Sequence, residues 1–393
     1  MSAELLNTAS VAAYIATQPH LAELVDPTTL TVVEVGDGNL NLVFIATDAA
    51  GSSLVLKQSL PYVRMVGESW PLSQDRILAE ARGFDAAVEF SPESVPAYYG
   101  LDEPRRVIAM EDLSGWKVWR RALNEGRISP GAAAAIGRYV ARVGFGTSVF
   151  AREAGHVKLA AAEAVNPELR KITEDLVFTQ PYIDHPDNAW HPEIDAEVLS
   201  LREGGLIDEI GVLKHHFTTH AEALIHGDLH TGSVFVPSWP SEVAAKIFDI
   251  EFSFYGPVAF DLGAFFGNVI IAQARAAVLD RPAEFREWLD GLVSEAWNAF
   301  DAEFRSLWPT RIDMLYTDVM RDRYLRQTFE NAIGFGGAKA IRRIVGLAKA
   351  SDIETLDRDD YTVAAAAVLQ TARAWVEGRA GFATAADLPR PLA

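Results

Sequence analysis

Residues 225–235 read IHGDLHTGSVF and place the carboxylate of Asp228 two residues from a histidine on each side. Two interpretations of this stretch predict different chemistry. In the first, His226, Asp228 and His230 bind a metal ion. In the second, the stretch is a catalytic loop in which Asp228 orients the attacking hydroxyl group during phosphoryl transfer. Residues elsewhere in the chain help to decide between the two.

The metal interpretation lacks ligands. Zinc enzymes use further His, Cys or carboxylate ligands at recognisable spacing, and the chain contains no cysteine. Residues 215–220, HHFTTH, put His216 and His220 four residues apart, but the segment lacks the glutamate of a helical zinc motif and favours an exposed helix face. We therefore prefer the catalytic loop, in which His226 holds the loop by hydrogen bonds and His230 lines the site.

Phosphoryl transfer also needs a loop over the phosphates and a lysine that contacts them. Residues 36–41, GDGNLN, form a tight turn whose glycines, including Gly38, let backbone amides approach phosphate oxygens. Lys57 lies in the apolar strand pattern LVLKQ, where a lysine is costly without an anionic partner. Glu80, on the helix that follows, is a candidate partner for Lys57.

Carboxylates for Mg²⁺ come from the segment KIFDIEF. The kinase pattern has an asparagine as a second metal ligand five residues after the catalytic aspartate, where this chain has Ser233. We expect Asp249 and Glu251 to compensate for that change. Because residues i and i+2 of a strand face the same side, a strand here predicts that both carboxylates bind Mg²⁺ on the β- and γ-phosphates. The apolar neighbours of both acids argue against a solvated hairpin.

The order of the elements predicts an α+β, bilobal, protein kinase-like fold. A chain of 393 residues exceeds the size of one hydrophobic core. Residues 31–60 have the pattern of a three-stranded antiparallel meander, and a helix pattern at 73–90 and two more strands follow. We expect a small antiparallel-sheet lobe at residues 1–113, ending at a hinge, and a larger, mostly helical lobe at 114–393. Nucleotide would bind in the crevice between them.

Composition excludes several partners. The formal charge of -19 repels nucleic acid, and the absence of cysteine suits a reducing cytoplasm. The N-terminus lacks the pattern of a secretory signal. The most apolar long stretch, residues 258–279, carries Asp261, Asn268 and Arg275, which a bilayer would penalise, so we expect a buried helix and no membrane span.

Several strings resemble the 5-methylthioribose kinase family, a group of small-molecule kinases with the protein kinase-like and aminoglycoside phosphotransferase fold. They include GDGNLNLVF, MEDLSGW, HGDLHTGSVF, FDIEFSFYGPVAFDLGAFFGNV and RRIVGLAKASDIETL. The resemblance implies transfer of the ATP γ-phosphate, with Mg²⁺, to the anomeric hydroxyl of 5-methylthioribose, a cytoplasmic step of methionine salvage. It also implies a homodimer, because family members are often dimers.

The resemblance also assigns residues by position. It implies that Asn39 or Asn41, together with Lys57, binds the ATP phosphates. Adenine would meet hinge backbone groups of Glu111, Asp112 and Leu113. Mg²⁺-ATP would lie at the segment Asp249, Ile250 and Glu251, where the family more often has a proline at the middle position; since both acids are kept, we expect only a small backbone adjustment.

At the acceptor end, the resemblance implies that Asp228 contacts the sugar hydroxyls, and that Arg342 and Arg343 meet the substrate and the migrating phosphoryl group. Two guanidinium groups supply the positive charge that a phosphoryl transition state demands. Two rivals remain. One is a kinase of the same fold for another small alcohol, such as 5-deoxyribose, an aminoglycoside or choline. The other is a catalytically inactive scaffold, which has no physical need for four converging charges.

Overall fold

The structure is a computed structural model that describes residues 4–36, 40–63 and 67–391. Its N-terminal part is a five-stranded antiparallel sheet of order β1-β2-β3-β7-β6. The strands are β1 (Thr31–Glu34), β2 (Asn41–Thr47), β3 (Ser53–Ser59), β6 (Tyr98–Asp102) and β7 (Val107–Glu111). The predicted three-stranded meander is therefore confirmed as β1, β2 and β3.

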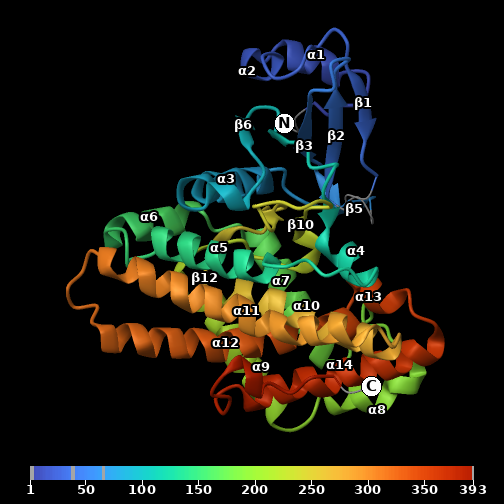
Figure 1. The fold of residues 1–393 in the computed structure, drawn as a ribbon, viewed down its shortest axis with the longest axis vertical. Helices are drawn as coiled ribbons and strands as arrows, with labels where there is room; N and C mark the ends of the chain where they lie inside the picture. The colour runs from blue at the N-terminus through green and yellow to red at the C-terminus, as the bar shows by residue number, and fades with distance from the viewer. Residues whose placement is uncertain (1–3, 37–39, 64–66, 392–393) are drawn as a thin grey trace.

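Three helices and a small hairpin accompany this sheet (Figure 1). The helices are α1 (Val11–Ala16), α2 (Pro19–Ala22) and α3 (Arg76–Phe90), and the hairpin joins β4 (Tyr62–Val63) to β5 (Gly67–Pro71). Helices α1 and α2 share a small apolar cluster with the sheet, through residues such as Val11, Ile15, Phe44 and Leu56. Helix α3 lies on the side toward the larger lobe.

The rest of the chain is mostly helical. Its helices are α4 (Trp119–Asn124), α5 (Ala132–Thr147), α6 (Ala154–Glu163), α7 (Pro167–Phe178), α8 (Asp195–Ser200), α9 (Gly205–Thr219), α10 (Ala259–Val278), α11 (Ala283–Leu307), α12 (Asp318–Val345), α13 (Ser351–Glu354) and α14 (Arg358–Gly378). Short strands interrupt them at β8 (Lys117–Val118), β9 (Ala223–Ile225), β10 (Val234–Val236), β11 (Lys246–Ile247) and β12 (Phe254–Gly256). The α+β, protein kinase-like fold class is thus confirmed.

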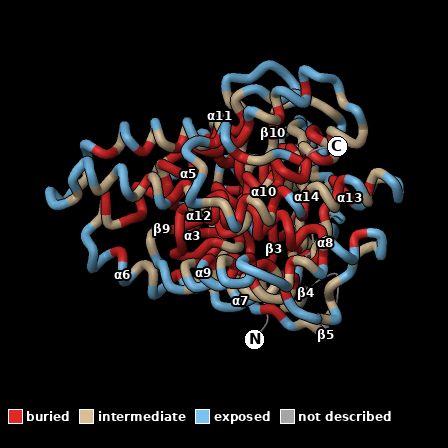
Figure 2. The backbone as a smooth tube through the Cα atoms, turned by 90° about the horizontal axis from the view of Figure 1, so that it is seen from below, coloured by how far each residue is buried: buried red, intermediate tan, exposed pale blue. Residues whose placement is uncertain are grey.

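The centre of the large lobe is built on α10 and the second half of α12, and Figure 2 shows α10 buried among the other helices. A methyl group built on Gly267 of α10 would lie 2.5 Å from the backbone oxygen of Gly336 on α12. Only glycine allows the two backbones to approach this closely. The predicted buried helix at 258–279 is confirmed as α10. Within the described residues, every helix is too short or too polar to span a bilayer.

The large core does not stop at residue 113. Ile77 and Phe84 of α3, with Ile108 and Met110 of β7, belong to the same contiguous apolar cluster as the C-terminal helices. Helix α3 is thus packed against the large lobe as well as carried by the small one. A division at residue 113 stays a prediction.

Candidate active site

The loop around Asp228 is held in place by a buried carboxylate. Gly227 has a φ of 84°, and a methyl group on it would lie 2.2 Å from the backbone oxygen of Phe252. Asp261, in the first turn of α10, accepts hydrogen bonds from the backbone N–H groups of His226 at 2.7 Å and Gly227 at 2.9 Å. Burial raises the pKa of Asp261, and the hydrogen bonds from these two N–H groups offset only part of that increase. The loop conformation therefore depends on α10.

The two histidines that flank Asp228 make different contacts. His226 donates from Nε2 to the backbone oxygen of Phe248 at 3.0 Å, as predicted for a loop-holding residue. His230 accepts from the backbone N–H of Gly232 at Nδ1, at 2.9 Å. The proton of a neutral His230 must then sit on Nε2, which lies 3.4 Å from Oδ2 of Asp228. Burial holds the pKa of His230 well below its ordinary value, so this ring is neutral at pH 7.

Ser233 closes the loop from the other end. Its hydroxyl donates to the backbone oxygen of Asp228 at 3.2 Å, and the side chain is buried in a short 3₁₀ turn, Thr231–Ser233. Its backbone N–H donates to the backbone oxygen of His230 at 2.8 Å. Ser233 therefore stabilises the loop conformation, at the position where the kinase pattern has a metal ligand.

The Asp228 carboxylate faces cations of α12. Oδ1 accepts a hydrogen bond from Nζ of Lys339, and Nη2 of Arg342 lies 3.8 Å from the same oxygen. Burial alone would raise the pKa of Asp228, but Lys339, His230, Arg342 and Arg343 outweigh it and hold that pKa well below its ordinary value. Asp228 is therefore ionised at neutral pH.

Arg343 and Arg120 extend this positive region. Arg343 is 7% exposed and donates to the backbone oxygen of Ala348 at 3.2 Å. Burial, with the neighbouring charges of Arg342 and Arg120, lowers its pKa well below the ordinary value. Arg120 of α4 lies 3.1 Å from Asp352 and donates to Asn268 at 2.8 Å. The predicted pair of arginines therefore lies at Asp228, and Arg120 joins it.

Lys57 of β3 is the centre of a second cluster. Its Nζ lies 2.8 Å from Oε1 of Glu80 on α3 and 2.5 Å from Oδ1 of Asp249. Burial opposes the charge of Lys57, but Asp249, Glu80 and Glu251 outweigh it and raise the pKa of this lysine. Burial also raises the pKa of Glu80. The charges of Asp249 and Glu251 raise it further, whereas the charge of Lys57 lowers it. The candidate pair of Lys57 and Glu80 is confirmed.

Glu251 joins the same cluster through two donors. Nδ2 of Asn41 donates to its Oε2 at 2.8 Å, and Nε of Arg76 lies 3.4 Å from the same oxygen. Asn41 thus ties the end of the phosphate-loop segment to the acidic segment. Gly38 and Asn39, the other predicted residues of that loop, lie outside the described residues.

The expectation that Asp249 and Glu251 share the face of a strand is wrong. Strand β11 ends at Ile247, Asp249 has a left-handed φ of 65°, and Glu251 lies in a turn. Asp249 still contacts Lys57, and Glu251 lies close enough for its charge to act on this lysine while its side chain pairs with Asn41 and Arg76. Ile250 between them is 1% exposed and packs against Gly83 of α3, so its side chain serves packing.

At the predicted hinge, several backbone and side-chain groups already make hydrogen bonds within the protein. The backbone N–H of Glu111 donates to Ala97, and the backbone oxygen of Leu113 accepts from Trp116 at 2.8 Å. The Glu111 side chain accepts from Lys246, and the Asp112 side chain accepts from Ser114 at 2.8 Å. These bonds narrow the set of hinge atoms that could meet adenine.

The two clusters lie on adjoining segments. The loop at residues 226–228 contacts the turn at 248–252 through the His226 bond and the close approach of Gly227 to Phe252. The carboxylates predicted to converge are therefore not on opposite surfaces. In the described residues, no group of three or more His, Asp or Glu side chains is arranged to hold a metal ion. The zinc interpretation finds no support there.

Sequence reasoning missed four functional neighbours: Lys339, Asp261, Arg76 and Arg120. Lys339 precedes Arg342 and Arg343 by three and four residues, a spacing that puts all three on one helix face. A charge inside an apolar helix also needs a partner, which could have identified Asp261. No local pattern marks Arg76 or Arg120.

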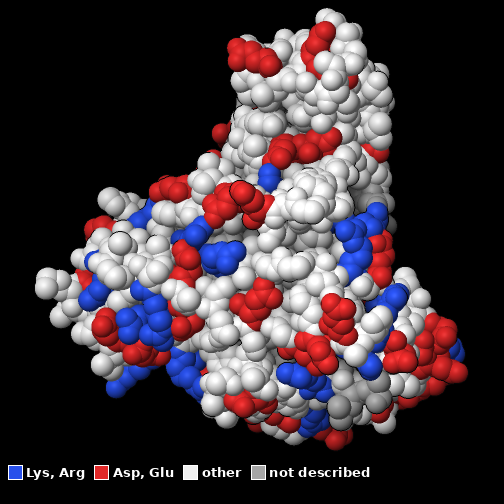
Figure 3. Space-filling view, in the orientation of Figure 1, with Lys and Arg blue, Asp and Glu red and all other residues white. Residues whose placement is uncertain are grey.

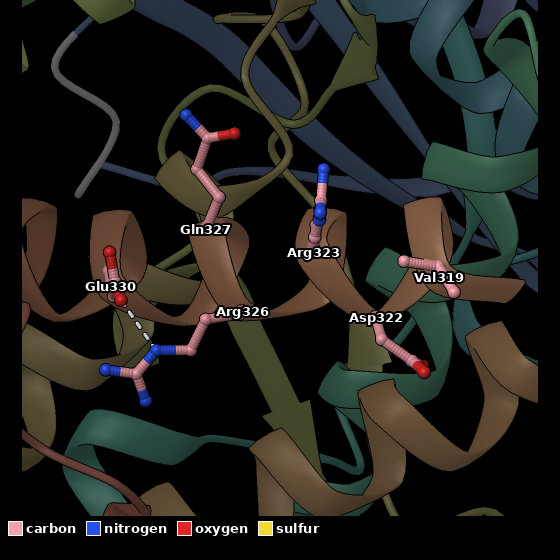
Figure 4. A pocket seen from close by; sticks show the side chains of 6 residues that line it. All are labelled: Val319, Asp322, Arg323, Arg326, Gln327 and Glu330. Carbon is pink, nitrogen blue, oxygen red and sulfur yellow. Dashed lines mark hydrogen bonds and ion pairs between the residues drawn. The ribbon is translucent and has the colours of Figure 1, made fainter.

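Figure 3 shows acidic and basic side chains intermixed over one face of the large lobe. A groove of about 560 Å³ runs along the first half of α12, and it contains none of the predicted site residues (Figure 4). Its lining comprises Val319, Asp322, Arg323, Arg326, Gln327 and Glu330.

A small antiparallel lobe, a buried lysine with acidic partners and an aspartate set among cations define a phosphotransferase. In agreement, the Phosphotransferase enzyme family (APH) matches residues 31–302. Methylthioribose kinase of Geobacillus thermodenitrificans is 40% identical over 344 residues, covering 86% of this chain and 85% of the relative. Methylthioribose kinase of Yersinia pseudotuberculosis is 40% identical over 349 residues, covering 87% and 85%. The chain belongs to the methylthioribose kinase family, as the sequence resemblance implies.

The similarity to solved structures is much weaker. A choline kinase from Cryptosporidium parvum is 10% identical, with a TM-score of 0.48 and coverage of 94% of this chain and 96% of that one. A Plasmodium vivax ethanolamine kinase is 12% identical, with a TM-score of 0.46 and coverage of 91% and 87%.

Proposed function

We propose that the protein transfers the γ-phosphoryl group of ATP to the anomeric hydroxyl of 5-methylthioribose and forms the 1-phosphate. The observation that carries the proposal is the setting of Asp228, a partly buried carboxylate fixed by Lys339 and adjoining Arg342 and Arg343. An ionised carboxylate can accept the hydroxyl proton, and the guanidinium groups can meet the charge of the phosphoryl group. The methylthioribose kinase relatives support the choice of sugar.

The Lys57 cluster supports a role at the phosphates of ATP. Within the described residues it holds three carboxylates, Glu80, Asp249 and Glu251, against two cations, Lys57 and Arg76. This excess of negative charge suits Mg²⁺, which is usually held by one or two carboxylates with phosphate oxygens completing the set. Asp249, 43% exposed, and Glu251 would hold the ion. When bound, Mg²⁺ neutralises charge on the β- and γ-phosphates.

The remaining assignments follow the family. Asn39 or Asn41, with Gly38, would contact the phosphates beside Lys57, and hinge atoms among Glu111, Asp112 and Leu113 would meet adenine. Residues 1–113 and 114–393 would act as two lobes. The reaction would belong to methionine salvage in the cytoplasm, and the enzyme would be a homodimer.

A coupled assay of ADP release tests the proposal. We expect turnover with 5-methylthioribose, ATP and Mg²⁺, and much slower turnover with choline or an aminoglycoside, whose amines would be repelled by the arginine pair. A comparison with 5-deoxyribose measures how strictly the methylthio group is required. Faster turnover of an amine-bearing alcohol would overturn the assignment of the substrate.

A further inference from the structure

Lys339 is buried at the centre of the acceptor end. It is 2% exposed, its Nζ donates to Oδ1 of Asp228, and the same nitrogen lies 5.0 Å from the ring centroid of Phe260. The lysine therefore has an anion on one side and an aromatic face on the other, and both environments favour its positive charge. No role is assigned to this residue by the motifs of the sequence.

The position of Lys339 depends on the packing of two helices. The close approach of Gly267 and Gly336 brings α12 against α10, the helix whose first turn holds the Asp228 loop through Asp261. Lys339 lies one turn before Arg342 on α12 and therefore shares its face. The same contact that buries the lysine thus fixes it against the loop.

Other titratable groups, most of them charged, face Asp228 from the surrounding elements. They are His230 of the same loop, Arg342 and Arg343 of α12, Arg120 of α4 and Asp261 of α10. Of these groups and Lys339, the lysine makes a direct hydrogen bond, whereas Arg342 stands 3.8 Å away and the neutral His230 3.4 Å away. Lys339 is therefore the cation that fixes the carboxylate.

We propose that Lys339 is a positioning residue for phosphoryl transfer, one that fixes the ionised Asp228 carboxylate beside the acceptor hydroxyl and remains as positive charge when Asp228 takes the proton. The inference rests on the proposed function. In the step, the acceptor oxygen bonds to the γ-phosphorus and the bond to the bridging oxygen breaks, leaving its electron pair on ADP. The hydroxyl proton passes to Asp228.

The proton transfer changes the local charge at the moment of reaction. Asp228 becomes neutral, so the positive charges of Lys339, Arg342 and Arg343 are no longer balanced by it. They then favour the transferred phosphoryl group, which carries negative charge. Before the reaction, Lys339 thus stabilises the ionised Asp228. After the proton transfer, its positive charge stabilises the phosphorylated product.

The proposal predicts a pH signature. Burial lowers the pKa of Lys339 to about 8. The charge of Asp228 raises this pKa, but Arg342 and Arg343 lower it. Activity of the native enzyme should therefore fall above that pH as Lys339 loses its proton. Arginine keeps its charge to much higher pH, so Lys339→Arg should move the alkaline limb of kcat upward by at least about one pH unit.

The test compares Lys339→Met, Lys339→Arg and a matched Lys214→Met control. Lys214 lies on α9 and donates to Thr179, away from Asp228. For Lys339→Met we expect kcat to fall about 100-fold, KM for ATP to stay unchanged, and the alkaline limb near pH 8 to disappear. Lys214→Met should match the native enzyme.

The outcomes separate this inference from the function itself. Native turnover of 5-methylthioribose tests the function, whereas the variants test Lys339. A Lys339→Met enzyme with native kcat overturns the inference, and so does a slow variant that keeps the native alkaline limb, because a merely structural role leaves the limb in place. If Lys339→Met does not fold, Lys339→Arg with an unmoved limb overturns it equally.

Discussion

The two charged clusters of the site have opposite excesses. Around Lys57, the described residues bring three carboxylates to two cations. Around Asp228, four cations, Lys339, Arg342, Arg343 and Arg120, accompany three carboxylates, Asp228, Asp261 and Asp352. A chain with a net charge of -19 thus keeps a buried positive region of its own.

The difference fits the direction of the proposed reaction. An acidic cluster needs a divalent cation before it can accept a triphosphate, whereas a cationic cluster attracts a phosphoryl group directly. The phosphoryl group would then move from the acidic Lys57 cluster, which needs Mg²⁺ for positive charge, to the Asp228 cluster, whose own side chains are positively charged. Substitutions on each side should therefore affect different kinetic constants.

The largest effect is expected at Asp228. Asp228→Asn keeps the shape of the side chain but removes the proton acceptor, so kcat should fall by about 10³- to 10⁴-fold. Calorimetric titration should still show Mg²⁺-dependent ATP binding, since the Lys57 cluster is untouched. An Asp175→Asn variant, whose native partner is the surface residue Lys171, serves as the control. Loss of ATP binding in Asp228→Asn would contradict the separation of the two clusters.

The next largest effect is expected at Arg342. Its Nε is a buried donor without a hydrogen-bond partner among the described residues, so an anion bound there would gain a ready partner. Arg342→Met should lower kcat/KM for the thiosugar by about 10²-fold and leave KM for ATP near its native value. Arg342→Lys should not restore the activity, because an ammonium lacks the planar fork of donors. Equal losses for both substrates would argue against a role limited to the acceptor end.

A smaller effect is expected on the nucleotide side. Glu80→Gln removes one carboxylate from Lys57, and we expect KM for ATP to rise about 10-fold, a loss typical of a buried pair. KM for the thiosugar should stay unchanged. Glu89→Gln on the same helix, whose native partner is the exposed Arg152, is the matched control. A parallel rise in both KM values would show that the clusters act as one.

The smallest effect concerns stability in acid and lies outside both clusters. Burial lowers the pKa of His216 on α9 from 6.5 to about 4, with His220 and His215 adding to the effect. The folded protein then binds fewer protons here than the unfolded chain, so stability present above pH 6.5 is lost as pH falls toward 4. After a discount for partial exposure, this is about 1 kcal/mol between pH 7 and 5.

Chemical denaturation at pH 7 and pH 5 measures this loss. His216→Asn should lose less stability over that interval than the native protein, whereas a variant at the exposed His156 should behave like the native protein. An unchanged pH dependence in His216→Asn would show that other groups control acid unfolding.

Much of the site could be predicted from local sequence. Lys57 stood out as a lysine in an apolar strand, and Asp228 as an acid in a tight loop between histidines; both lie where those patterns indicated. Asp249 and Glu251 lie in the Lys57 cluster as expected, but the strand geometry predicted for them was wrong. Alternation assumes a strand, but β11 ends at Ile247 and Asp249 has a left-handed backbone conformation.

The sequence by itself determined the fold class, the family and the residues of the phosphotransferase pattern, because these depend on short-range periodicity and on motifs within a few residues. Tertiary structure alone decided which charges meet. The Asn41–Glu251 bond spans 210 residues, and the Lys339–Asp228 bond spans 111. Pairing over such distances depends on how helices such as α10 and α12 pack, and no local pattern records that packing.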